Sequence, residues 1–241
     1  MEPREHVQHF RIEAASLLAA CRAEPTAGVP SCPGWDRTEL LTHVAGVHAW
    51  VRRQLEDGPA ERVRLSTVSR PPEGDELVPF FEAGAAELAS ALDAMDVAAT
   101  WPTWAGPQPG TFYPRRMAHE VAVHRWDAVP TPVDAELAVD GLDELLELFA
   151  PLLPADRFGG ATGTIHLHAT DDGLAQTGEW LVTFGRDGIA FEKGHAKGDV
   201  AVRGMASDLL LWAWNRVPVD ERFEVFGDRA LLDLWREAVR F

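Results

Sequence analysis

The hydrophobic pattern of this chain changes its period near residues 129–136, where "VPTPVDAE" holds two prolines and no apolar repeat. Before this stretch, apolar residues recur at the spacing that lines one face of an α-helix. After it, short runs alternate apolar and polar residues between Gly and Asp, as strands do. We therefore predict a four-helix domain over residues 1–130 and an α+β domain over residues 135–241, so that the whole chain is of the α+β class.

The first domain is predicted to be a helical bundle. Its four helices are expected at residues 7–24, 35–57, 75–95 and 114–129. Asp36 or Thr38 can cap the second helix. Residues 99–114 are rich in Pro and Gly and are predicted to form a long connecting loop, in which Trp101 and Trp104 could line a pocket, although core packing is the commoner use of tryptophan. The core of such a bundle can hold a metal between facing helices.

The second domain is predicted to combine a small sheet with segregated helices. Strands are expected at residues 163–170, 178–184, 188–194 and 198–204. Helices are expected at about residues 138–150, 205–217 and 228–241. The "RDG" that precedes Ile189 is typical of a hairpin turn.

The charge of the chain excludes some classes of partner. There are 22 Lys and Arg against 38 Asp and Glu, a formal net charge of −16. Nucleic acids and anionic membranes both call for a basic surface, so we expect neither as a partner. The charged N-terminus has no apolar leader and no segment is long and apolar enough for a membrane span, which predicts a cytoplasmic protein. Only two cysteines occur, with neither a CxxC motif nor a Cys/His zinc-finger spacing, so we expect neither a disulfide scaffold nor a structural zinc site.

The stretch "RRMAHEVAVHRWD" at residues 115–127 contains candidate metal-binding residues. Successive residues of an α-helix rotate by about 100°, so Glu120 and His124 share one face while His119 and His124 diverge by roughly 140°. Glu120 and His124 are therefore the pair that can bind one ion, and a third ligand must come from a facing helix. His119 is left as a group beside the site or as a packed or solvated residue.

The second helix offers that third ligand in "LTHVAGVHAW". His43 and His48 are five residues apart, so only one of them can point at a given spot. His43 lies in the apolar register of Leu40 and Val44, and we assign it as the ligand. Imidazole and carboxylate ligands with an open position fit zinc or a similar divalent metal. From spacing alone, the commoner alternative is a hydrogen-bonded or solvated His/Glu pair and a core histidine.

Three long motifs show a family resemblance. "VPSCPGWDRTELLTHVAGVHAW" and "PRRMAHEVAVHRWDA" resemble the second and fourth helices of mycothiol-dependent maleylpyruvate isomerase-like proteins, within the DinB-like four-helix superfamily. "GDVAVRGMASDLLLWAWNRV" is similar to their C-terminal domain, which has a sterol-carrier-like fold. The resemblance implies a metal triad of His43, Glu120 and His124, with zinc as the first choice of metal, and an actinobacterial source.

The resemblance also implies an activity. Members with known activity use the thiol mycothiol as a co-substrate, so a metal-bound thiolate would attack a small electrophilic substrate. The reaction would be isomerisation, thiol transfer or hydrolysis. An arginine of the C-terminal domain contributes to the family's active site, and we assign Arg203 as this catalytic residue because a guanidinium binds a carboxylate bidentately. The alternative for Arg203 is an ordinary surface arginine.

Several alternatives stay open at this point. The chain could bind a metal or a hydrophobic ligand without turnover, because fold does not fix function. It could be a monomer or a homodimer, and a stress-response metal protein that acts as a dimer is a weaker possibility. Cys32, near the start of the second helix, is either a stabilised thiolate or, more commonly, a structural cysteine. His166 and His168 share one face of a strand and are a candidate second metal pair, although such a pair usually marks a half-exposed sheet face.

Overall fold

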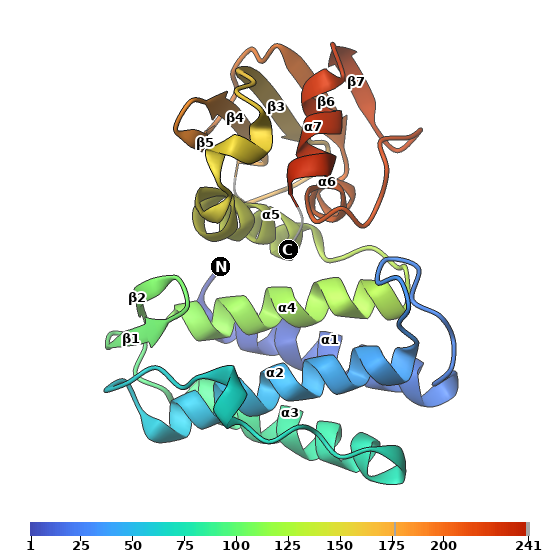
Figure 1. The fold of residues 1–241 in the computed structure, drawn as a ribbon, viewed down its shortest axis with the longest axis vertical. Coiled ribbons are helices and arrows are strands. Elements are labelled where there is room, and N and C mark those ends of the chain that lie inside the picture. Colours follow the sequence, from blue (N-terminus) through green and yellow to red (C-terminus); the bar gives the residue numbers. More distant parts are fainter. Residues whose placement is uncertain (176, 240–241) are drawn as a thin grey trace. The chain divides into compact units, whose positions relative to one another are not determined.

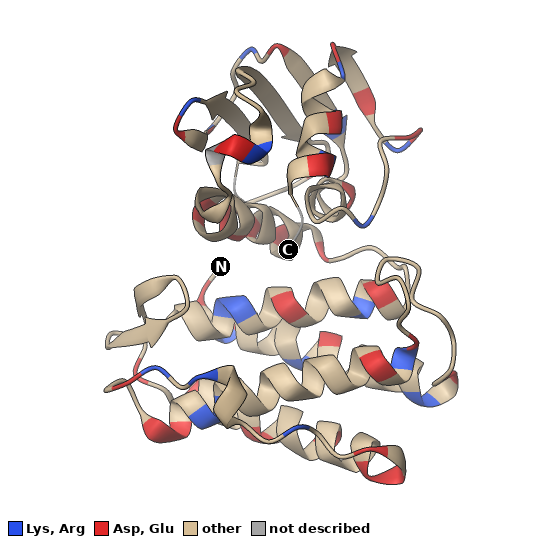
Figure 2. Cartoon of the chain, viewed as in Figure 1, with Lys and Arg blue, Asp and Glu red and all other residues tan. Residues whose placement is uncertain are grey.

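The computed structural model describes residues 1–175 and 177–239. The chain divides into two compact units, Met1–Thr131 (unit 1) and Pro132–Phe241 (unit 2). Asp and Glu residues, red in Figure 2, are spread along the helices and loops of both units. No helix in the described ranges combines the length and the apolar character that a membrane crossing requires.

Unit 1 is a bundle of four long helices (Figure 1). They are α1 (Pro3–Ala23), α2 (Arg37–Asp57), α3 (Leu77–Ala94) and α4 (Phe112–Ala128). α1 packs chiefly on α4, and α2 packs chiefly on α3. The core is made of fully buried apolar side chains such as Phe10, Leu17, Leu40, Leu88 and Val121. Short 3-10 turns, η1 (Leu65–Thr67) and η2 (Gly74–Glu76), lie in the connection between α2 and α3.

The start of α2 is fixed by a capping box, which confirms one of the two predicted caps. The Asp36 side chain accepts hydrogen bonds from the backbone N–H groups of Thr38 and Glu39 at 2.9 and 3.0 Å. The Glu39 carboxylate accepts from the Asp36 N–H at 2.7 Å in return. Arg37 then donates to the backbone oxygen of Ala128 at the end of α4, at 2.7 Å. These contacts hold the start of α2 against the end of α4.

Helix α4 is buried on nearly all sides, and its polar residues are buried with it. Small residues such as Ala118 and Ala122 let neighbouring helices approach closely. A buried charge needs a partner, and Arg125 has one, since its Nε donates to the Glu13 carboxylate of α1 at 2.5 Å. Arg125 and Glu13 therefore form a buried ion pair between α4 and α1.

The connection between α3 and α4 is not the plain loop that its composition predicts. It contains a two-stranded antiparallel sheet of β1 (Thr100–Thr103) and β2 (Gly106–Pro109). Prolines are tolerated there because both strands are edge strands. Trp101 is buried and meets Tyr113 edge-on, with ring centroids 6.0 Å apart, and Trp104 meets Phe112 in the same way at 6.1 Å. Both rings therefore make packing contacts.

Unit 2 contains a five-stranded sheet in the order β5-β4-β3-β6-β7 (Figure 1). The strands are β3 (Gly163–Ala169), β4 (Glu179–Gly185), β5 (Gly188–Lys193), β6 (Val200–Gly204) and β7 (Glu224–Gly227). β3 and β6 are parallel, and the other neighbouring strands are antiparallel. The predicted α+β class and the hairpin turn before Ile189 are confirmed. β7 is a strand that the sequence pattern did not predict.

Three helices accompany the sheet: α5 (Ala135–Glu144), α6 (Ala206–Ala213) and α7 (Ala230–Ala238). The predicted helix at about 138–150 thus begins earlier and passes at Leu145 into a π-helical turn, Leu145–Phe149, and a 3-10 turn, Ala150–Leu152. A further 3-10 turn, Ala155–Phe158, precedes β3. The predicted helix at 205–217 ends at Ala213, and the last two residues of the one predicted at 228–241 lie outside the described residues.

The two faces of the sheet differ in burial. Ile165 and Leu167 of β3 are buried on one face, together with Trp180 and Val182 of β4. Because side chains alternate along a strand, His166 and His168 lie on the opposite face. Phe226 of β7 is 55% exposed.

Candidate metal centre

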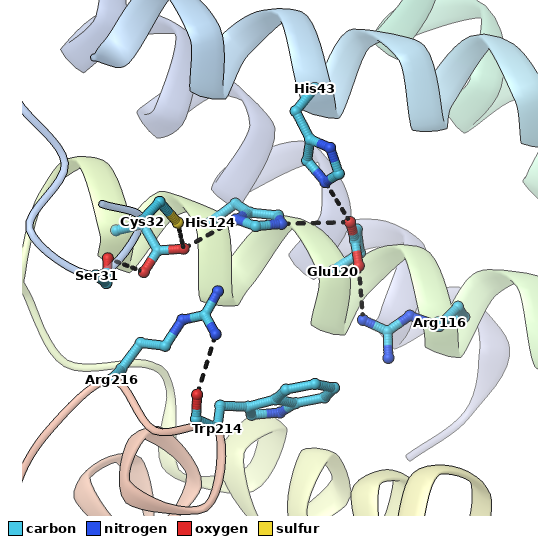
Figure 3. Close-up of polar contacts among 9 residues, drawn as sticks. Ser31, Cys32, His43, Arg116, Glu120, His124, Trp214 and Arg216 are labelled. Carbon is cyan, nitrogen blue, oxygen red and sulfur yellow. Dashed lines mark hydrogen bonds and ion pairs between the residues drawn. The ribbon is translucent and has the colours of Figure 1, made fainter. Parts of the chain in front are cut away.

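Three side chains from two helices meet inside unit 1 (Figure 3). His43 comes from α2, and Glu120 and His124 come from α4. The Glu120 Oε1 atom lies 3.5 Å from His43 Nε2 and 3.4 Å from His124 Nε2. The two imidazole rings are 5.0 Å apart between centroids. The structure thus brings together the three residues that were predicted as ligands.

The spacing of these atoms suits a tetrahedral metal. Ligand atoms about 2.1 Å from a tetrahedral zinc ion lie about 3.4 Å from one another, which matches the two measured separations. The His43 side chain is 39% exposed, whereas the Glu120 and His124 side chains are 20% and 11% exposed. The site is exposed to solvent on the His43 side, which leaves room for a fourth, exogenous ligand beside the three protein ligands. The donor set of two imidazoles and one carboxylate therefore fits a divalent metal such as zinc.

A second layer of contacts orients His124. Its Nδ1 atom lies 2.9 Å from the Asp127 carboxylate, whose side chain is fully buried. Asp127 also accepts a hydrogen bond from the Ser31 hydroxyl at 2.6 Å and a weak one from the Cys32 thiol at 3.9 Å. A carboxylate on the far nitrogen fixes the ring and tautomer of a ligating histidine. Cys32 contacts this supporting carboxylate, which favours the structural interpretation of that thiol.

Glu120 is held at both of its oxygens. Arg116, one helical turn earlier, donates to Oε2 at 3.0 Å and leaves Oε1 facing the two histidines. Partial burial raises the pKa of Glu120, but hydrogen bonds from His124 and His43 and the Arg116 charge outweigh it and keep the pKa well below its ordinary value. Glu120 is therefore an ionised carboxylate.

The same network acts on His124. Burial lowers its pKa, but hydrogen bonds to Asp127 and Glu120 and their negative charges raise it overall to about 9. Without a metal His124 is therefore protonated near neutral pH, and a metal ion that binds its Nε2 atom has to displace that proton.

The other histidines of these helices lie elsewhere. His48 is buried between Phe10 and Phe81, at centroid distances of 5.0 and 5.2 Å. His119 is buried and meets His6 of α1 edge-on at 5.8 Å. The structure thus places His43, and not His48, beside the pair on α4.

Arg203 lies on β6 of unit 2. It stands in register with His168 of β3 and Glu224 of β7, and its Nη1 donates to the Glu224 carboxylate at 3.2 Å. Its side chain is 43% exposed. Figure 3 also draws Arg216 of unit 2, whose Nη1 donates to the backbone oxygen of Trp214 at 3.0 Å.

Sequence models of one family match both units. The model described as the mycothiol maleylpyruvate isomerase N-terminal domain matches residues 7–129, and that of the C-terminal domain of the same isomerase matches residues 136–234. The chain belongs to the mycothiol maleylpyruvate isomerase family. The resemblance seen in the motifs of α2, α4 and the C-terminal part is thereby confirmed.

Solved structures of the family share the fold of this member. The mycothiol-dependent maleylpyruvate isomerase is 14% identical, with 93% of each chain covered and a TM-score of 0.61. A histidine-to-alanine mutant of that isomerase is 15% identical, with 90% of each chain covered and a TM-score of 0.59. No curated protein sequence matches this family member significantly. At such low sequence identity the likeness establishes the fold and does not establish the reaction.

Proposed function

We propose that this chain is a metal-dependent enzyme of the maleylpyruvate isomerase type, in which the sulfur of mycothiol attacks a small electrophilic substrate. In an isomerase the C–S bond forms, a carbon–carbon bond rotates and the C–S bond breaks again to release the thiol; in a thiol transferase the C–S bond remains in the product. The observation that carries the proposal is the convergence of His43, Glu120 and His124 on a point that is open on the His43 side. Family membership supports the choice of thiol, because the related enzyme of known structure is mycothiol-dependent.

When bound, a divalent metal lowers the pKa of a thiol that ligates it, so that the thiol reacts as a thiolate near neutral pH. The residues of the chain prepare this site. Asp127 holds the His124 ring, and Arg116 holds the Glu120 carboxylate, so neither ligand has to reorient. One carboxylate and two neutral imidazoles leave a net positive charge with a divalent ion, which favours an anionic thiol.

We assign Arg203 the role of orienting an anionic substrate. A planar guanidinium binds a carboxylate with two parallel hydrogen bonds. In the structure this group is bound to Glu224, so the substrate would have to displace that carboxylate. If the role is correct, Arg203→Gln raises KM for a carboxylate substrate much more than it lowers kcat. Unchanged kinetics would identify Arg203 as an ordinary surface residue.

The activity is tested with zinc-loaded protein, mycothiol and a maleyl-type substrate. We expect conversion by the wild type and loss of conversion in His43→Ala and Glu120→Ala. His9→Ala is the matched control, because His9 is an α1 histidine outside the cluster, and it should retain full activity. Full activity in both ligand variants would overturn the proposal. Stoichiometric metal binding without conversion of any electrophile would favour the non-catalytic alternative.

A further inference from the structure

A second cluster of potential ligands lies within unit 2. His166 and His168 of β3, Glu179 of β4 and His195, just after β5, each offer one ligand atom within 4.8 Å of the others. The Glu179 Oε2 atom lies 3.0 Å from His166 Nε2 and 2.7 Å from His195 Nδ1. The Glu179 Oε1 atom lies 3.6 Å from His168 Nδ1. Three imidazoles therefore converge on one carboxylate.

The topology of the sheet explains why these residues meet. His168 and Glu179 are directly paired across β3 and β4, and side chains of paired residues project to the same face. Residues 194–199 connect β5 to β6, which lies on the other side of β4 and β3, so this segment must pass both strands. The Gly194 N–H donates to the Glu179 backbone oxygen at 2.9 Å, which anchors the segment where His195 begins.

The four side chains of this cluster differ widely in their exposure to solvent. The side-chain exposure is 7% for His166, 20% for Glu179, 28% for His168 and 79% for His195. Burial lowers the pKa of His168 below its ordinary value. For Glu179, burial raises the pKa, but hydrogen bonds from His195 and His166 lower it overall, so the carboxylate is ionised.

We propose that His166, His168, Glu179 and His195 form a second divalent-metal site, separate from the one in unit 1. Three imidazole nitrogens and one carboxylate oxygen suit a borderline ion such as zinc. The nitrogen–oxygen distances bracket the separation of about 3.4 Å expected around tetrahedral zinc, so small side-chain shifts suffice. Four protein ligands close the coordination sphere, which makes this a structural or regulatory site that fixes residues 194–199 over the sheet.

Arg203 is a competing positive charge, because it is the register neighbour of His168 on β6. Its guanidinium is paired with Glu224, which draws positive charge away from the cluster. The alternative to a metal is a purely hydrogen-bonded cluster, in which each imidazole donates a proton to Glu179. The two states differ in one measurable respect, because only the first binds zinc stoichiometrically.

The experiment uses the full chain without a histidine tag, stripped with a chelator, reloaded with zinc and desalted before elemental analysis. We expect two zinc ions per wild-type chain and one in His195→Ala, whose exposed side chain can be removed without disturbing the core. Glu179→Gln should also lose one ion, while the matched control His9→Ala keeps both. His43→Ala should lose only the ion of unit 1, so failure of one site is distinguishable from failure of the other.

Cobalt provides a readout of coordination that does not depend on activity. In a protein carrying His43→Ala and Glu120→Ala, bound Co²⁺ should still give the intense visible absorption of a tetrahedral site, and adding His195→Ala should abolish it. Equal zinc content in wild type, His195→Ala and Glu179→Gln would overturn the proposal and leave the hydrogen-bonded cluster as the correct description.

Discussion

At the scale of single residues, the candidate metal centre of unit 1 depends on side chains that do not ligate. Asp127 accepts hydrogen bonds from Ser31 and Cys32 and holds the far nitrogen of His124. Arg116 holds the far oxygen of Glu120. These contacts fix the ligands before a metal arrives, which reduces the cost of binding one.

Asp127→Asn tests this support directly. The amide keeps the size of the side chain but removes the negative charge beside His124, so zinc affinity should fall about 10–100-fold. Affinity is measured by competition with a chromophoric chelator, on protein that also carries His195→Ala so that only unit 1 binds. Ser31→Ala is the control and should cause a smaller loss. An unchanged affinity in Asp127→Asn would show that the carboxylate has no part in metal binding.

The burial of His48 predicts how the stability of the protein depends on pH. Burial lowers its pKa from 6.5 to about 4, and neither ring nitrogen has a hydrogen-bond partner among the described residues. The unfolded chain therefore binds the proton more readily, so stability is full above pH 6.5 and is lost as pH falls toward 4. Between pH 8 and pH 5 this one group should cost about 2 kcal/mol.

The check is denaturant unfolding of wild type and His48→Leu at both pH values. The variant should lose about 2 kcal/mol less stability than the wild type on going from pH 8 to pH 5. His9→Leu should follow the wild type. Identical pH dependence in His48→Leu and wild type would contradict the assigned pKa.

The residues of the candidate metal centre in unit 1 could be predicted from the sequence only in part. Glu120 and His124 could be paired because a four-residue spacing on a helix is fixed by geometry. His43 was chosen because it shares a register with Leu40 and Val44, yet the structure shows His48 as the buried histidine and His43 as 39% exposed. The predicted histidine does lie beside Glu120, but the expectation that it belongs to the apolar face of α2 is wrong. The contact of Asp127 with His124 was not predicted, although Asp127 lies three residues later on the same helix.

At the scale of elements, α2 and α4 determine the site, and both have local reasons to form where they do. α2 begins at a capping box, and several polar residues of α4 are buried with it. The start and end of α2 were predictable because Asp36, Glu39 and Gly58 are local signals. The strands β1, β2 and β7 were not, since each has four residues and depends on a partner strand rather than on a long alternating pattern.

Asp36→Ala tests the capping box. Loss of the side-chain acceptor leaves the N–H groups of Thr38 and Glu39 without it and should lower the free energy of unfolding by about 1 kcal/mol. Asp36→Asn, which keeps an acceptor oxygen, should lose much less. A variant Asp36→Ala as stable as the wild type in thermal unfolding would show that the cap does not stabilise α2.

At the scale of the whole molecule, the spacing of apolar residues changes from helical to alternating near residues 129–136. The boundary between the two units lies in the same stretch of chain. The units meet in sequence between Thr131 and Pro132. Each has its own buried core, with Leu40 and Val121 in unit 1 and Trp180 and Leu209 in unit 2. The position of His195 beside Glu179 could not be predicted, because the order of the strands, and not local spacing, brings the two residues together.

Separate production of residues 1–131 and 132–241 tests this organisation. Because each unit buries an apolar core of its own, both fragments should unfold cooperatively, and each should bind one zinc ion. Circular dichroism, thermal unfolding and elemental analysis are the measurements. If either fragment shows no cooperative transition, the units are not independent folding domains.

Anomalous scattering from crystals of the zinc-loaded protein shows whether His43, Glu120 and His124 hold a metal. We predict a zinc peak about 2.0–2.2 Å from His43 Nε2, Glu120 Oε1 and His124 Nε2, with a fourth position open to solvent. A map with no anomalous peak among these three atoms, from protein that carries zinc elsewhere or not at all, would contradict the account.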